Sequence, residues 1–198
     1  MIEVEKKIAL RPGDRERLLT GATFLKEKRL RDIYFDDKDF SLTVKDWWLR
    51  KRNDAFELKV PIVAPVSDDL FDQYHEFEDE QSIRQELALP TGGTFADDIA
   101  HVGIVPIIDI TTTRQEYSYD GFIIDIDSMD FGYEVAEIEL LVASQAEVDV
   151  AMQKITAFIV ERGLMITQVY GKVLTYLERY SPAHFQKLMD AWGWKRHL

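Results

Sequence analysis

Charged side chains at alternate positions are the feature that most constrains the fold of this chain. Near its start these residues are Glu3, Glu5 and Lys7, and farther along they are Asp125 and Asp127 with an isoleucine between them. Successive side chains of a strand point to opposite faces of a sheet. The pattern therefore predicts β-strands that have one charged face and one apolar face.

Eight segments have this period or a comparable β-rich composition. They are Ile2–Ala9, Arg29–Phe35, Trp47–Arg52, Phe56–Pro61, Gln73–Asp79, Ile107–Tyr119, Phe122–Met129 and Tyr133–Val142. Most neighbouring segments are joined by short connections, and the pair Asp120-Gly121 favours a tight hairpin, so we expect antiparallel pairing. Helical patterns occupy the intervals, at Gly13–Leu19, Ser82–Leu87, Phe95–His101, Gln145–Arg162, Lys172–Arg179 and His184–Trp192. The sequence predicts an α+β fold, with an eight-stranded antiparallel sheet closed into a barrel and peripheral helices.

Length and composition restrict the class of protein. The 198 residues suit a single domain over 1–198, in which 181–198 form a helical tail. There is no cysteine, which excludes disulfides, thiolate nucleophiles and cysteine-ligated metals. A net charge of −12 argues against nucleic acid and anionic membranes as partners. No apolar run is long enough to span a membrane, and the charged first residues are unlike a secretory signal. We expect a cytoplasmic protein that is a monomer.

The charges are also sorted by strand, since some strands carry paired acids and one carries Arg50 and Arg52. For any one strand, a solvated outer face is the better interpretation. Like charges about 7 Å apart on one face repel by about 2 kcal/mol at an effective dielectric near 20. A divalent cation on the acids and an anion on the bases would together offset this repulsion. The pattern thus predicts a metal-chelated polyphosphate as ligand, provided that the charged faces share one cavity.

The motifs resemble those of the CYTH domain, or triphosphate tunnel metalloenzyme family. Glu3-Val4-Glu5-Lys6-Lys7 is similar to the ExExK signature that opens this domain. The remaining motifs follow in the family's order: Trp48–Arg52, Glu57–Lys59, Tyr74–Glu76, Arg114–Tyr117, Asp125–Asp127, Glu137–Glu139 and Gly171–Lys172. Trp48, Glu57-Leu58-Lys59 and Asp130-Phe131-Gly132-Tyr133 resemble the branch that hydrolyses thiamine triphosphate. The tail after Pro182 has no counterpart among these motifs.

The resemblance implies a β-barrel around a tunnel or cleft, and Mg²⁺-dependent removal of the terminal phosphate from a small-molecule triphosphate. Mn²⁺ is a possible substitute for Mg²⁺. The expected substrate is thiamine triphosphate, and the products are thiamine diphosphate and phosphate.

The resemblance also implies a role for each site residue. The residues expected to bind the triphosphate are Lys7, Arg50, Arg52, Lys59, Arg114 and Lys172, with Trp48 as an aromatic wall against the thiazolium ring. The expected metal ligands are Glu3, Glu5, Asp125, Glu137 and Glu139, with Asp127 as a weaker candidate. The catalytic candidates are Glu3, Glu5, Lys59 and Glu76. Glu3 and Glu5 would serve a metal or the attacking water, and Glu76 would orient water or pair with a lysine.

Several alternatives remain open at this point. A structural ion pair explains Arg31 at least as well as a role in the site does. Glu57 and Glu78 are interpreted as structural charges, and Trp48 could be a core or rim residue. The enzyme could instead prefer inorganic triphosphate, or cyclise ATP as some family members do. A polyphosphate-binding module without catalysis is a further alternative, but such a module would be expected to lose the acids that are present here. A pure interaction protein would give no reason for the sorted charges.

Overall fold

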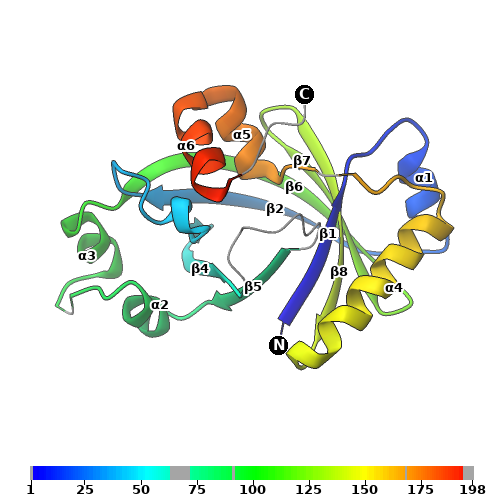
Figure 1. Ribbon diagram of the computed structural model, residues 1–198, viewed down its shortest axis with the longest axis horizontal. Helices are drawn as coiled ribbons and strands as arrows, with labels where there is room; N and C mark the ends of the chain where they lie inside the picture. Colours follow the sequence, from blue (N-terminus) through cyan, green and yellow to red (C-terminus); the bar gives the residue numbers. More distant parts are fainter. Residues whose placement is uncertain (1, 63–71, 91, 168, 194–198) are drawn as a thin grey trace. The chain divides into compact units, whose positions relative to one another are not determined.

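The computed structural model describes residues 2–62, 72–90, 92–167 and 169–193 (Figure 1). Its strands are β1 (Ile2–Ile8), β2 (Thr23–Asp36), β3 (Trp48–Arg52), β4 (Ala55–Pro61), β5 (Asp72–Phe77), β6 (Val105–Tyr119), β7 (Phe122–Met129) and β8 (Tyr133–Val142). Its α-helices are α1 (Asp14–Leu18), α2 (Glu80–Glu86), α3 (Phe95–His101), α4 (Val148–Glu161), α5 (Lys172–Tyr180) and α6 (Pro182–Trp192). Two 3₁₀ turns, η1 (Thr43–Lys45) and η2 (Gln145–Glu147), complete the described elements.

The sheet has the predicted architecture. Within the described residues, eight strands form a closed barrel in the order β1-β5-β4-β3-β2-β6-β7-β8. The pairings whose register is defined are antiparallel, including β1 with β8 and β3 with β4. The hairpin between β6 and β7 turns at Asp120 (φ 45°) and Gly121 (φ 85°), where positive φ suits a tight two-residue turn. The predicted α+β barrel is confirmed.

One strand is much longer than the sequence indicates. The prediction began at Arg29, whereas β2 begins at Thr23. Its first residues are nearly all exposed, including Phe24 and Leu25, so they lack the alternation of buried and polar side chains on which the prediction depended.

The chain divides into two compact units, which we describe separately. The first comprises Met1–Leu30, Asp68–Gln73 and Thr111–Tyr176. Its apolar core lies on one face of β1, β7 and β8, with Val4, Ile124 and Ile138 fully buried against α4. Figure 1 shows α4 running beside β1 and β8. Because α4 covers the apolar face, the alternating acids of these strands lie on the opposite face.

The second unit comprises Arg31–Ser67, Tyr74–Ile110 and Leu177–Leu198. Leu49 of β3 and Leu58 of β4 are fully buried in its core, together with Ile83 of α2 and Ile99 of α3. This core again occupies one face of the strands, and the basic side chains of β3 and β4 alternate with it. The assignment of 1–198 to a single domain stays a prediction.

The last helix was predicted to begin at His184, whereas α6 begins two residues earlier, at Pro182. Pro182 occupies the first turn of α6, a position that tolerates a missing N–H. Within the second unit, α6 contacts η1, where the indole Nε1–H of Trp192 donates to the Val44 carbonyl at 3.0 Å. Positions 63–71 and 194–198 lie outside the described residues. None of the described helices is both long enough and apolar enough to cross a membrane.

Candidate active site

Carboxylates from three adjacent strands gather on the charged face of the first unit. The pairing of β1 with β8 places Glu5 opposite Glu139, and the pairing of β7 with β8 places Asp125 opposite Glu137. Side chains directly opposite each other on one face lie about 4.5–5.5 Å apart at Cβ. The register therefore brings together acids that are more than a hundred residues apart in the chain.

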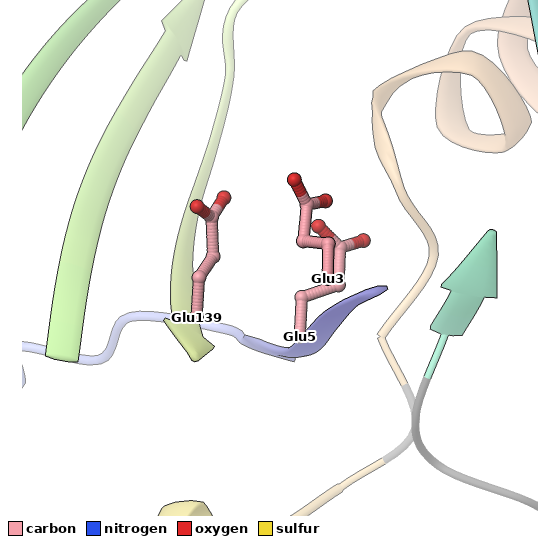
Figure 2. Close-up of side chains that lie close together, drawn as sticks. All are labelled: Glu3, Glu5 and Glu139. Atoms are coloured by element: carbon pink, nitrogen blue, oxygen red, sulfur yellow. The ribbon is translucent and has the colours of Figure 1, made fainter. Parts of the chain in front are cut away.

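Two groups of three carboxylates are close enough to hold a metal ion. Oxygens of Glu3, Glu5 and Glu139 lie within 4.8 Å of one another, and so do oxygens of Asp125, Glu137 and Glu139. Figure 2 shows the first group, with the three carboxylates projecting from β1 and β8 to the same side. Glu139 belongs to both groups. Five of the six predicted metal ligands thus lie in two metal-sized groups, whereas Asp127 belongs to neither.

Arg114 of β6 lies among these acids. Its guanidinium donates to Asp127 at 2.6 and 2.7 Å and to Glu137 at 2.6 Å, and it also forms an ion pair with Asp125. Glu139 lies 3.9 Å from it. The permanent positive charge of Arg114 reduces the electrostatic repulsion among these carboxylates. The sequence predicted Arg114 as a phosphate ligand and did not indicate its carboxylate partners.

The acids retain strong mutual repulsion despite Arg114. Burial, together with Glu137 and Asp127 and against the attraction of Arg114, raises the pKa of Asp125 to about 7. Burial and the neighbouring Glu3 and Glu5 raise the pKa of Glu139 to about 10. In addition, Oδ1 of Asp125 is buried and has no hydrogen-bond partner among the described residues. A buried acceptor without a donor, next to other hard oxygen donors, fits a divalent cation.

Two lysines of the first unit border the acids. Lys7 follows the acids of β1 and forms an ion pair with Glu5. Its side chain passes close to the backbone of Gly171, where an added Cβ would lie 3.2 Å from its Cε. Lys172 begins α5, and its Nζ lies 3.5 Å from the Thr112 hydroxyl. Gly171-Lys172 thus combines a site for close backbone approach with a cation, which the sequence alone did not explain.

The predicted bases of β3 and β4 lie on one face of the second unit. Arg50 is buried and contacts Glu57 at 2.5 Å, and Arg52 contacts Asp32 at 2.7 Å. Lys59 forms an ion pair with Glu76 of β5, the pairing anticipated as one role for that acid.

The charge sorting therefore has a second explanation besides a bound ligand. The acids and bases that are separated by strand are paired across strands, because register puts each base opposite or diagonal to an acid. Repulsion between like charges on one strand is therefore offset in part by these ion pairs and does not by itself require a ligand. Arg31, by contrast, pairs with Asp109 where both side chains are largely exposed, as its structural interpretation predicts.

Trp48 lies at the end of this basic face and is held by several polar and aromatic groups. Its indole Nε1–H donates to Asp46 Oδ1 at 2.7 Å. Its ring meets Tyr34 and Trp192 in edge-to-face arrangements, each with centroids 6.3 Å apart. It remains only partly buried, whereas Trp47 packs against the core as predicted. Asp46 was not among the predicted site residues, because an acid in a short turn gives no signal that distinguishes it from a solvated one.

The structure thus brings the predicted site residues into one cluster in each unit. The first contains Glu3, Glu5, Lys7, Arg114, Asp125, Asp127, Glu137, Glu139 and Lys172, and the second contains Trp48, Arg50, Arg52, Lys59 and Glu76. That the two clusters share one cavity stays a prediction.

The comparisons with known proteins agree with the motifs. Residues 1–167 match the CYTH domain. The chain belongs to the CYTH family. It is 33% identical to human thiamine-triphosphatase over 208 aligned positions, which cover 96% of this chain and 90% of the human protein. The thiamine-triphosphatase of Macaca fascicularis matches at the same identity and coverage.

Solved structures of low sequence identity show the same fold. A protein from Pyrococcus horikoshii OT3 superimposes with a TM-score of 0.67 at 20% identity, over 89% of this chain and 99% of that one. A Hippeastrum protein, described as a putative adenylyl cyclase with a dominant triphosphatase activity, gives a TM-score of 0.58 at 18% identity. That match covers 90% of this chain and 95% of the Hippeastrum chain.

Proposed function

We propose that this protein hydrolyses thiamine triphosphate to thiamine diphosphate and phosphate with the help of Mg²⁺. The observation that carries the proposal is the pair of carboxylate groups that share Glu139 and include the unpartnered oxygen of Asp125. A sequence identity of 33% to two thiamine-triphosphatases, over 96% of this chain, supports the same substrate.

The metal would be held by Glu3, Glu5 and Glu139, by Asp125, Glu137 and Glu139, or by both groups. Their hard oxygen donors suit Mg²⁺, and Mn²⁺ accepts the same ligands. When bound, the ion would neutralise charge on the phosphate oxygens and favour ionisation of water. The carboxylates would hold the metal ion in place. Asp125 and Glu139, whose pKa values are raised, are the acids that a bound cation would return to the ionised form.

The bases bind the phosphate chain. Phosphoryl transfer is catalysed mainly by positioning and charge neutralisation, for which guanidinium and ammonium groups are suited. We assign this role to Lys7, Arg50, Arg52, Lys59, Arg114 and Lys172. Most of these bases already pair with a carboxylate. When the triphosphate binds, its phosphate oxygens would therefore replace carboxylate oxygens as partners of the bases.

The proton of the attacking water would pass to a carboxylate of the first unit. Glu3 and Glu5 are the candidates, because their oxygens lie in the metal-sized group with Glu139 and both extend from one strand. Glu76 is a weaker candidate than the sequence suggested, since it belongs to neither metal-sized group of carboxylates among the described residues.

The decisive experiment is a phosphate-release assay on thiamine triphosphate, inorganic triphosphate and ATP. Each substrate would be tested with Mg²⁺, with Mn²⁺ and with EDTA, and cyclic AMP formation would be measured for ATP. We expect the highest kcat/KM for thiamine triphosphate and no release with EDTA. A strong preference for inorganic triphosphate would refute the substrate assignment. Triphosphate binding without phosphate release would favour the non-catalytic alternative.

Trp48→Ala tests the aromatic contribution to that preference. Stacking and cation–π attraction of about 1 kcal/mol correspond to roughly a five- to ten-fold rise in KM for thiamine triphosphate. Inorganic triphosphate, which has no ring, should show no comparable change. Trp47→Ala is the matched control, because Trp47 packs on the other face of the sheet. An equal loss on both substrates in Trp48→Ala would show that the indole does not contribute to substrate preference.

Cytoplasmic location, a monomeric state and the absence of nucleic-acid partners stay predictions.

A further inference from the structure

Asp46 is a buried carboxylate in a part of the second unit to which no role has yet been given. It follows η1 and precedes β3 by two residues, and it is 8% exposed. Its backbone is left-handed, with φ 63° and ψ 29°, a conformation that Asp and Asn adopt more readily than other non-glycine residues. Buried acids of this kind are rare unless donors surround them.

Two aromatic side chains donate hydrogen bonds to the Asp46 carboxylate. Its Oδ1 accepts the indole N–H of Trp48 at 2.7 Å. The hydroxyl of Tyr74, on β5, donates to its two oxygens at 3.1 and 3.0 Å. The carboxylate therefore links the start of β3 to β5 through one indole and one phenol. A hydrogen bond has a preferred direction, so this link fixes the orientation of the indole.

Two aromatic rings also contact Trp48, and these contacts are less directional than that bond. Tyr34 and Trp192 meet its ring edge to face, at interplanar angles of 88° and 77°. Contacts of this kind contribute about 0.5–1.5 kcal/mol each and have no single donor–acceptor axis. The N–H bond to Asp46 is directional, because a hydrogen bond weakens steeply away from linearity. It is therefore the contact that distinguishes one rotation of the indole from another.

We propose that Asp46 is a positioning residue that sets substrate specificity through Trp48, holding the indole in the orientation that receives an organic group attached to the triphosphate. The inference rests on the proposed function and adds a residue to it. Asp46 touches no phosphate in this account. Its loss should weaken discrimination between an organic triphosphate and inorganic triphosphate, and leave hydrolysis of the inorganic substrate nearly unchanged.

The test compares Asp46→Gly with Asp46→Asn. Glycine removes the acceptor and tolerates the left-handed backbone, whereas asparagine keeps an oxygen for the indole and also tolerates that backbone. We expect Asp46→Gly to raise KM for thiamine triphosphate several-fold while its kcat and both constants for inorganic triphosphate stay close to wild type. Asp46→Asn should restore most of the loss. The Trp48 indole N–H resonance should shift and exchange faster in the glycine variant only.

Two further variants separate specificity from folding. Tyr74→Phe removes the phenol hydroxyl that donates to Asp46 and leaves the indole bond, so the ratio of kcat/KM values for the two substrates should persist. In a Trp48→Ala background, Asp46→Gly should have no additional effect on that ratio. An additive effect there, or an equal loss on both substrates in Asp46→Gly alone, would overturn the inference. If wild-type enzyme did not prefer thiamine triphosphate, the proposed function would fail first, and the indole resonance would still report whether Asp46 holds Trp48.

Discussion

At the scale of single residues, the charged face of the first unit depends on one arginine. Arg114 contacts Asp125, Asp127 and Glu137, and its side chain is 15% exposed. Burial opposes its charge, but these carboxylates outweigh burial and raise its pKa well above the ordinary value. Removing one partner of a buried charge network leaves the other charges uncompensated.

Arg114→Ala should therefore lower the free energy of unfolding by about 3–5 kcal/mol without divalent metal. It should also abolish measurable hydrolysis, because a phosphate ligand is lost. Urea denaturation followed by circular dichroism measures the first effect. Arg31→Ala is the control, since its pair with Asp109 is exposed and its removal should cost less than about 1 kcal/mol. Equal losses in the two variants would contradict the assigned role of Arg114.

At the scale of elements, α6 is fixed to the segment before β3 through His184. This imidazole is 1% exposed and stacks on Phe40, with ring centroids 3.6 Å apart. The Thr43 hydroxyl donates its proton to Asp36 at 2.6 Å and lies 2.8 Å from Nε2 of His184. Because Thr43 has only that proton, Nε2 must carry a hydrogen and donate to the Thr43 oxygen. The neutral ring thus completes a chain that joins α6, η1 and the end of β2.

This chain predicts a pH dependence of stability. Burial, assisted by Lys187 and opposed by Asp36, lowers the pKa of His184 to about 4 from a usual 6.5. Between pH 6.5 and pH 4, His184 is therefore protonated in the unfolded chain but neutral in the folded protein. Stability from this group is present above pH 6.5 and is lost over that window, by up to about 3 kcal/mol.

Chemical denaturation between pH 4 and pH 7 measures the effect. His184→Gln, which retains a donor for Thr43, should show a shallower decline than wild type. His75→Gln is the control for replacing a histidine by glutamine, because His75 is exposed on β5. A wild-type slope in His184→Gln would show that other groups account for the decline.

At the scale of the whole molecule, the net charge of −12 and the buried acids make divalent metal a stabilising ligand. A ligand that binds only the folded state raises its stability in proportion to the logarithm of ligand concentration. We expect Mg²⁺ at about a hundred times its dissociation constant to add about 2.7 kcal/mol, measured as a rise in the melting temperature. NaCl at matched ionic strength serves as the control for screening.

Glu139→Gln makes the same prediction specific. Its carboxyl belongs to both metal-sized groups, and its raised pKa shows that the charged form is unfavourable in the folded protein. The neutral amide should therefore stabilise the metal-free protein at and above pH 7, weaken the response to Mg²⁺ and abolish hydrolysis. A full Mg²⁺ response in this variant would place the metal elsewhere.

Much of the fold was predictable because local patterns carry it. The strands β1, β7 and β8 each have one buried and one charged face, so their sequences alternate with a period of two. The turn between β6 and β7 was predictable because Asp-Gly readily adopts the positive φ that a tight hairpin requires. The predicted helix Gln145–Arg162 is correct in its interior, but its first residues form η2 and α4 begins only at Val148. The Ser144 hydroxyl donates to the Glu147 carboxylate instead of accepting a backbone N–H. The residue types alone do not show whether this hydroxyl bonds a side chain or a backbone N–H, so the start of the helix was misplaced.

The sequence by itself determined which residue types could bind a metal-chelated triphosphate, because alternation along a strand assigns each side chain to a face whatever the partner strand is. Only the tertiary structure decided which charges are neighbours. Cross-strand register gave Arg50 to Glu57, Arg52 to Asp32 and Lys59 to Glu76. The turn before β3 brought the Asp46 carboxylate to the indole N–H of Trp48, a contact that no period encodes. Register and turn geometry are set by the packing of the whole sheet, so these contacts follow from the fold and not from any single segment.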